Sequence, residues 1–462
     1  MAPVAIPLFL ELGLGMAVGL VGTALAARQA DAAAASFALA HQVAAMLFIL
    51  LRIVGAGVSV VVSQALGAGR RDEADAVARA VLGASSWVGG LCAGLAVAGA
   101  TPLMQLLNAP PEVLPLAAPF LQWMAPALLL DAWNAAMASV MRAHLRTREV
   151  LAVVLAMHTL HLVLALLLMP RFGLAGFAAA LTASRALGLG LHLFLWRTRL
   201  NLHPGWHDLW RLPRRELAAV LRIGAPGAAE NIAWRLAFMV SVAVTGSLGA
   251  QALATHAYVM LFTHFTLLGG LAIGLAGEIV VGHHIGAGQL HQAHRLVRRA
   301  LALGLATSAG LSVAMALAGP ALLALLTTDP AIRQQGAVLL WWGLALETGR
   351  SFNLVVINAL RAAGDARYPV AVGAVSMAVV LAGGSWWLGA HLGWGLVGVW
   401  IAYAADEWLR GLLMWWRWRR LGWVPHARAA RRRLRRGRPS ETPPPTPSPT
   451  PSPTPSEPQP DG

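Results

Sequence analysis

The chain has 462 residues, of which 57% are hydrophobic and only 12% are charged, and its mean hydropathy is +0.63. Charged residues are about half as frequent as in a typical soluble domain. Apolar stretches long enough to cross a bilayer recur from one end to the other. The composition therefore excludes a soluble enzyme, a disulfide scaffold and a disordered protein. It also argues against a nucleic-acid partner, because the formal charge of +15 resides in loops and a tail between apolar segments.

Twelve apolar segments follow one another along the chain, and each predicts a membrane-spanning helix. Several are longer than the roughly 20 residues that a bilayer requires, which predicts tilted or kinked helices. The predicted helix cores cover residues 3–27, 33–66, 75–101, 113–141, 149–169, 174–197, 217–247, 252–285, 295–321, 332–360, 368–390 and 394–416.

The placement of arginine predicts the orientation of these helices. All 35 basic residues are arginine, and the connections after odd-numbered helices contain only Arg28, Arg171 and Arg333. The other loop arginines lie in the connections after even-numbered helices and in the tail. Because basic loops stay in the cytoplasm, we predict a multi-pass protein of the bacterial inner (plasma) membrane with both termini cytoplasmic.

The two halves of the sequence repeat each other. A shift of 219 residues places Pro7-x-x-x-Glu11 on Pro226-x-x-x-Glu230, Gly67–Gly69 on Gly286–Gly288, and Arg142 on Arg361. Beyond residue 369 the shift becomes 222. Six helices in each half make the repeat parallel, and transporters built this way alternate access by rocking their lobes about a central site.

The predicted architecture is an all-α membrane protein with two parallel six-helix lobes around a central cleft. Residues 1–200 form the amino-terminal lobe, and residues 217–420 form the carboxy-terminal lobe. Tryptophans and arginines in the connecting segment 201–216 predict a linker that lies on the membrane interface. Residues 421–462 are predicted to form a cytoplasmic tail that is basic first and then Pro-rich and disordered.

Several motifs in this order resemble those of the multidrug and toxic compound extrusion (MATE) transporters. They are LRIGAPGAAENIAWRLAF (221–238), SQALGAG (63–69), GHHIGAG (282–288), VMRAHLRTR (140–148) and ALRAAGDAR (359–367). The resemblance implies a V-shaped fold of twelve helices. It also implies export of organic, often cationic, compounds driven by H⁺ or Na⁺ antiport.

The sequence departs from the family pattern at two positions. Gly22 stands where the first helix of the family usually carries an aspartate, and Trp234 stands where an acidic residue often follows the proline of the seventh helix. Any coupling site must therefore use other carboxylates.

Charged residues within the predicted helices are the candidate site. Each costs roughly 2.5–3.5 kcal/mol at a helix centre, so they must face protein, water or one another. A buried carboxylate can carry H⁺ or Na⁺ and can bind a cationic substrate. The candidates for ion coupling or substrate binding are Glu278, Asp131, Glu230, Glu347 and Glu11.

Opposite charges occupy matching positions in the two halves. Asp131 corresponds to Arg350 at the first shift, and Arg185 corresponds to Glu407 at the second. We predict that such residues form a gate across the cleft, while local pairing of Glu347 with Arg350 and of Glu407 with Arg410 is the simpler alternative. Trp123 and Trp234 are candidate aromatic contacts for a cationic substrate.

Two other functions remain open. A flippase for a lipid-linked oligosaccharide or a related precursor would need an arginine-lined cleft, so the sign of the charges in the cleft distinguishes it from a cation exporter. A membrane-embedded transferase would use His158 and His161, three residues apart on one helix. We expect no enzymatic activity, no metal and no cofactor beyond the coupling ion. The expected partners are a small organic substrate and the lipid bilayer, and the chain is expected to be a monomer.

Overall fold

The fold is helical, and no strand occurs in residues 1–107 and 109–436, which the computed structural model describes. The side chains of residues 48–54, 56 and 436 lie outside the described part. The first lobe contains α1 (Ala2–Ala27), α2 (Asp31–Gly67), α3 (Arg71–Ala98), α4 (Ala100–Leu106), α5 (Leu114–Trp123), α6 (Ala125–Ala143), α7 (Thr147–Leu195) and η1 (Trp196–Leu200).

A short turn, η2 (Trp206–Leu209), lies in the connection to the second lobe. The second lobe then contains α8 (Arg214–Ser247), α9 (Ala250–Ala287), α10 (Leu290–Leu326), α11 (Pro330–Ala362), α12 (Arg367–Ser376), η3 (Met377–Gly383), η4 (Ser385–His391) and α13 (Gly395–Arg419). The final helix is α14 (Val424–Arg436).

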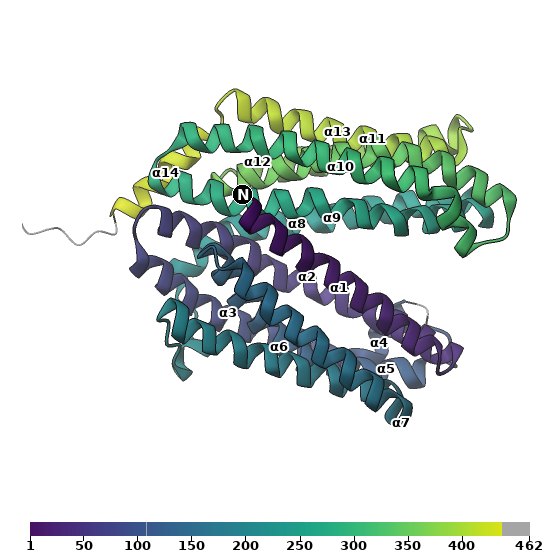
Figure 1. The fold of residues 1–462 in the computed structure, drawn as a ribbon, viewed down its shortest axis with the longest axis horizontal. Coiled ribbons are helices and arrows are strands. Elements are labelled where there is room, and N and C mark those ends of the chain that lie inside the picture. The colour runs from purple at the N-terminus through teal and green to yellow at the C-terminus, as the bar shows by residue number, and fades with distance from the viewer. Residues whose placement is uncertain (108, 437–462) are drawn as a thin grey trace, which may run out of the picture.

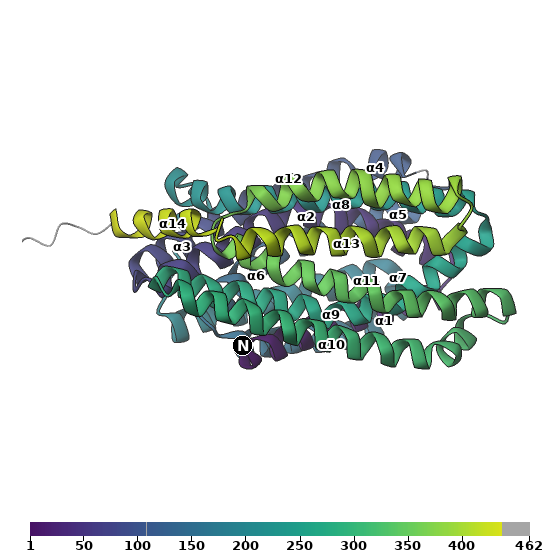
Figure 2. The ribbon, with the colours of Figure 1, turned by 90° about the horizontal axis from the view of Figure 1, so that it is seen from above.

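The two lobes form a V in Figure 1. They converge at the end where α14 and the amino terminus lie, and they diverge towards the opposite end. The loops at the converging end are the predicted arginine-rich connections, and we call it the arginine-rich end. Seen from above in Figure 2, the long helices of both lobes run along the same axis, as parallel membrane spans do.

These elements supply the twelve predicted spans, with local differences, of which two are bends or breaks. The fifth and sixth spans together form α7, with a kink at Gly173 between them, where the backbone adopts a φ of 58°. Glycine tolerates this left-handed conformation because it has no Cβ. The fourth span is the bent pair α5 and α6, which meet at 42° where Pro126 begins α6.

Six helices satisfy length and hydropathy requirements for crossing a membrane, and the bent pair makes seven in the described part of the chain. Further long helices, among them α8, α11 and α13, contain charged residues in the middle of their sequences. Those charges lower the hydropathy of these spans and mark the part of the fold that requires a polar interior.

The lobes exchange the beginnings of their first helices. Val4, Ala5 and Leu8 of α1 pack into a cluster with α9, α10 and α11 of the second lobe. Val220 and Ile223 of α8 pack into the main cluster of the first lobe. The later parts of both helices pack in their own lobes, as Ala26 of α1 and Ala237 of α8 show. The exchange joins the lobes at the arginine-rich end.

The basic segment of the predicted tail forms α14, and residues 437–462, including the Pro-rich segment, lie outside the described residues. Trp423 and Ala427 are buried in a cluster of the second lobe. Leu434 is buried in the main cluster of the first lobe. The segment thus contacts both lobes.

Candidate functional site

A cavity of 290 Å³ lies among α8, α9, α11 and α13, and we call it the second-lobe chamber. Its wall combines charged side chains with aromatic and aliphatic ones. The polar and aromatic lining residues are Glu230, Asn231, Trp234, Arg235, Phe238, His264, Arg350, Asn353, Glu407 and Arg410. An apolar pocket with a few convergent polar groups is the usual form of a small-molecule site.

A buried charge network adjoins the chamber. Arg350 pairs with Glu347 at 2.7 Å and with Glu407 at 3.4 Å. Arg410 pairs with Glu407 at 2.9 Å and with Asp406 at 2.7 Å. These pairs confirm the local alternatives predicted from sequence. The network itself contains three acids and two arginines, and Arg235, without an ion pair in the described structure, lines the chamber beside it. One oxygen of Glu347 is buried without a hydrogen-bond partner in the described structure.

Equivalent ion pairs occupy the two lobes near the arginine-rich end. Glu11 of α1 pairs with Arg142 of α6. Glu230 of α8 pairs with Arg361 of α11. Both pairs join residues 131 apart, as the repeat requires. Each ties the start of the exchanged helix to the end of the fourth helix of a lobe.

The predicted gate pairs do not meet across the cleft in this structure. Asp131 pairs with Arg185 at 2.7 Å within the first lobe, whereas Arg350 pairs with Glu407 within the second. These four residues therefore form equivalent pairs with reversed polarity. The physical reason is that each position is adjacent to its complementary charge in its own lobe, so neither charge needs a partner from the other lobe.

Glu278 is placed differently from the other predicted acids. This residue of α9 is 4% exposed, and Ser59 of α2, in the other lobe, lies close to it. The charge of Arg361 also acts on it. Among the described residues, Glu278 forms no ion pair with an arginine, in contrast to Glu11, Asp131, Glu230 and Glu347.

The two predicted aromatic contacts also separate. Trp234 lines the second-lobe chamber, and its ring stacks on Phe238 at a centroid distance of 5.0 Å. Trp123 is 49% exposed at the end of α5 and does not line this chamber. Trp123 therefore lies at the bend between α5 and α6, away from this chamber, and its contact with a substrate stays a prediction.

The lobes cross at the ends of α2 and α9. Gln64 donates a hydrogen bond to the carbonyl of Ala362 at 2.8 Å, and His283 donates one to the carbonyl of Ala143 at 2.8 Å. Gln64 and His283 are repeat equivalents, as are the two alanines. The closing contact is thus one arrangement made twice, once from each lobe.

Two glycines permit this close approach. A Cβ at Gly67 would overlap the backbone of His283, and a Cβ at Gly286 would overlap the backbone of Gln64. Both glycines belong to the repeated motifs that carried the resemblance. The motif therefore has a direct physical role, because only glycine lets two helix backbones cross at this distance.

Sequence reasoning missed several of these residues. Arg142 and Arg361 were recognised as repeat landmarks but not as partners of Glu11 and Glu230. The signal was present, because the separation between acid and arginine is the same in both halves. Gln64 and His283 lie within the motifs SQALGAG and GHHIGAG, but their residue types alone do not predict a contact, since their hydrogen bonds go to backbone carbonyls of the other lobe.

The comparison with protein families decides the identification. The family model described as MatE matches residues 3–167 and 226–387, which together form more than half of the chain. The chain belongs to the MATE family. It is therefore a multi-pass membrane transporter of the multidrug and toxic compound extrusion type, a family of transporters rather than enzymes.

Individual MATE relatives agree. The uncharacterized transporter YisQ of Bacillus subtilis (strain 168) is 30% identical over 424 residues, covering 90% of this chain and 93% of YisQ. A probable multidrug resistance protein NorM of Xanthomonas campestris pv. campestris is 27% identical, covering 78% of this chain and 80% of that protein.

Solved MATE structures share the fold. The Vibrio cholerae MATE transporter VcmN in its bent form has a TM-score of 0.83 and 21% identity, covering 92% of this chain and 96% of VcmN. An outward-facing MATE family transporter of the MOP superfamily has a TM-score of 0.85 and 17% identity, covering 92% and 95%. The twelve-helix, two-lobe architecture predicted from sequence is confirmed.

Proposed function

We propose that this MATE transporter exports small organic compounds, cationic ones in particular, by antiport with H⁺ or Na⁺. The observation that carries the proposal is the second-lobe chamber, where aromatic rings lie beside a buried charge network with one more acid than arginine. The relatives named multidrug resistance proteins support the same substrate range. The chain acts as a monomer in this proposal, with no cofactor other than the coupling ion.

In the proposed orientation, the arginine-rich end faces the cytoplasm of a bacterium, and both termini lie there. The hydrogen bonds of Gln64 and His283 then close the cytoplasmic side, while the lobes diverge towards the outside. This conformation releases substrate outside and takes up the coupling ion. The return step separates the crossing of α2 and α9.

Glu278 is the proposed coupling residue. A carboxylate buried without a counter-ion is costly, and H⁺ or Na⁺ supplies the missing positive charge. Because Glu278 lies in one lobe and Ser59 in the other, binding of that ion acts at a contact between the lobes. Glu230, which lines the chamber and pairs with Arg361, and Glu347, which belongs to the charge network, contribute next to the substrate.

The proposed substrate site uses Trp234, Phe238 and the charge network. An organic cation can lie over an aromatic ring, where the attraction is about 0.5–2 kcal/mol. The additional acid of the network provides the matching charge. Competition between the coupling ion and the cation for this region would link their opposite movements.

The arginines that line the chamber give the alternative function, a flippase, a specific but weaker basis. Three arginines line the chamber, as a pyrophosphate site would require. However, Arg350 and Arg410 are already paired with acids. Of the three arginines that line the chamber, Arg235 alone has no ion pair in the described part of the chain. One unpaired arginine is a poor site for a doubly charged headgroup.

Transport in proteoliposomes tests the proposal. Wild-type protein should accumulate or release an organic cation when a pH gradient or a Na⁺ gradient is imposed alone, and the effective gradient identifies the ion. Glu278→Gln should abolish the response to the gradient while downhill exchange of substrate persists. Transport that ignores both gradients would contradict antiport, and preference for an anionic lipid headgroup would favour the flippase.

Two matched controls isolate the site. Asp31→Asn removes an exposed acid at the start of α2 and should leave coupling unchanged. Trp234→Ala should weaken the apparent affinity for the organic cation by about 5- to 30-fold, the range of a partly desolvated cation–π contact. Trp123→Ala, outside the chamber, should leave that affinity unchanged.

A further inference from the structure

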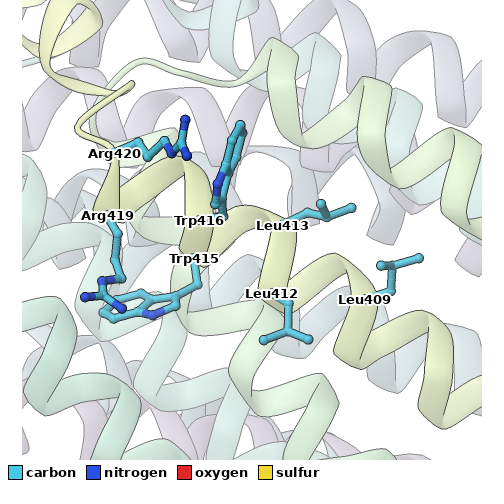
Figure 3. A pocket seen from close by; sticks show the side chains of 7 residues that line it. All are labelled: Leu409, Leu412, Leu413, Trp415, Trp416, Arg419 and Arg420. Atoms are coloured by element: carbon cyan, nitrogen blue, oxygen red, sulfur yellow. The ribbon is translucent and has the colours of Figure 1, made fainter.

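A second cavity opens on the surface away from the substrate chamber, at the arginine-rich end of α13. It measures 710 Å³ and is lined by leucines, tryptophans and arginines of one helix end. Figure 3 shows the seven side chains, with the arginines grouped at one end of the cavity and the leucines along the helix from them. The lining residues are Leu409, Leu412, Leu413, Trp415, Trp416, Arg419 and Arg420.

Neighbouring arginines at this helix end have different partners. Arg417 pairs with Asp365 at 2.9 Å and lies over the ring of Tyr368. Arg420 lies over the ring of Trp416 at 4.8 Å. Neither Arg419 nor Arg420 has an acidic partner within the described residues, so both present positive charge beside the cavity.

We propose that this cavity binds an anionic phospholipid. The guanidinium groups of Arg419 and Arg420 hold the headgroup phosphate, and the exposed side chains of Leu409 and Leu412 run beside the acyl chains. Trp416, half exposed, lies at the boundary between these regions, as tryptophan does at membrane interfaces. The proposal depends on the placement of this end at the inner leaflet and not on the identity of the substrate.

Native mass spectrometry of the full chain in detergent tests the site, with phosphatidylglycerol and phosphatidylcholine as probes. Each arginine near an anionic headgroup contributes about 1 kcal/mol of binding free energy. Two arginines should therefore give roughly a thirtyfold preference for phosphatidylglycerol over phosphatidylcholine. The double variant Arg419→Gln with Arg420→Gln should lose that preference. Arg417→Gln, whose arginine is engaged by Asp365, should keep it.

A separate arm adds inorganic phosphate at millimolar concentration. Phosphate should not displace phosphatidylglycerol, because it lacks the acyl chains that the leucines contact. An unchanged lipid preference in the double variant would overturn the site, and so would equal loss in Arg417→Gln. Displacement by phosphate would show a simple anion site. Thermal stability of each variant, measured in the same detergent, confirms that it is folded.

A second inference concerns α14, which bridges the lobes at the arginine-rich end. Its start is anchored in the second lobe by Trp423, the residue before the helix, and by Ala427 in its first turn, both buried. Its end is anchored in the first lobe by Leu434, which is 1% exposed, and Arg70 donates a hydrogen bond to the Leu434 carbonyl at 2.7 Å. Between these anchors, Arg431 contacts Gly288 at the end of α9.

We infer that α14 is a latch that holds the crossing of α2 and α9 closed. Rocking of the lobes must separate Leu434 from its cluster or Trp423 from its own, because one short helix is buried in both. The end at Leu434 is the weaker anchor, since it buries a single leucine. Opening at the arginine-rich end therefore requires release of the final turns of α14.

The latch is tested by the accessibility of the crossing. Cys92→Ser with Ser63→Cys places one thiol where Ser63 contacts Gly282 of the other lobe. Leu434→Asp, or a chain that ends at residue 423, should raise the rate of maleimide labelling from the arginine-rich side several-fold. A chain that ends at residue 436, and so retains α14, should label at the rate of the full chain.

Equal labelling in the latched and unlatched chains would overturn this inference. Labelling needs no substrate and no gradient, so its outcome is independent of the proposed antiport. Leu434→Asp keeps the length of the helix, and its result stands if the shorter chain does not fold.

Discussion

The two lobes are built on one plan, but they use their buried charges differently. The pairs Glu11–Arg142 and Glu230–Arg361 are the same contact made twice. Further into the lobes the symmetry ends: the first has the single pair Asp131–Arg185, and the second has a network of five charges beside a chamber. Duplication therefore preserves the joint between the lobes, while the polar interior has diverged in one of them.

The divergence can be followed residue by residue. Gly188 of the first lobe stands at the position of Arg410, and Ser184 at the position of Asp406. The first lobe thus lacks the second arginine and the additional acids. The small residues at these two positions cannot supply the charges that adjoin the second-lobe chamber.

Removal of the central arginine of the network is the most direct test of the difference between the two lobes. Arg410→Met leaves Asp406 and Glu407 buried without their main cation, so we expect a loss of about 3–5 kcal/mol in stability. Thermal unfolding in detergent, or the yield of folded protein, measures it. Arg185→Met should cost less, because its single partner Asp131 is more accessible. Equal losses of stability in the two variants would show that the buried charges of the two lobes are equally important for folding.

Exchange of the acid and the arginine within one pair tests whether Asp131–Arg185 and Arg350–Glu407 are equivalent contacts. Asp131→Arg or Arg185→Asp alone should destabilise the first lobe, because each leaves two like charges together. The double variant reproduces the polarity of the second lobe and should recover roughly 0.5–3 kcal/mol of the summed loss. A double-mutant cycle on thermal unfolding measures the recovery. Additive losses would mean that the residues do not pair within the lobe.

The glycines of the crossing should respond alike in both lobes. Gly67→Ala and Gly286→Ala each place a Cβ against backbone of the opposite lobe. We expect each to destabilise the closed crossing by about 1–3 kcal/mol. Faster maleimide labelling of a thiol at position 63 measures the opening. Gly310→Ala, which faces open space, is the control. A response in only one lobe would contradict the symmetry of the crossing.

The smallest expected effect is that of the reciprocal hydrogen bonds. Gln64→Ala and His283→Ala each remove one bond to a backbone carbonyl, worth about 0.5–1.5 kcal/mol. Each should raise the rate of labelling by less than the glycine variants do, and the two together by the product of the single effects. The same labelling assay measures both.

Much of the fold could be predicted from the sequence because membrane burial dictates it. Apolar length and arginine placement located twelve spans, and the repeat located two lobes. The bend before Pro126 and the break at Gly173 required geometry, because proline and glycine permit a kink without fixing its angle.

The site was less predictable, because a charge correspondence does not say which residues touch. The match of Asp131 with Arg350 was a correct observation about the repeat, yet each residue pairs within its own lobe. The orientation of side chains between helices decides this, and periodicity along one helix does not contain it. Local pairs three residues apart, such as Glu347 with Arg350, were predictable because one helix face holds both.

The exchange of α1 and α8 between the lobes has the form of a domain swap contained in one polypeptide. At the arginine-rich end, the hydrophobic interior of each lobe includes the start of a helix that belongs to the other lobe. Produced as separate chains, the two halves would be obligate partners, and each would fold fully only on the other. In the proposed transport cycle, the lobes would rotate about the exchanged starts of α1 and α8.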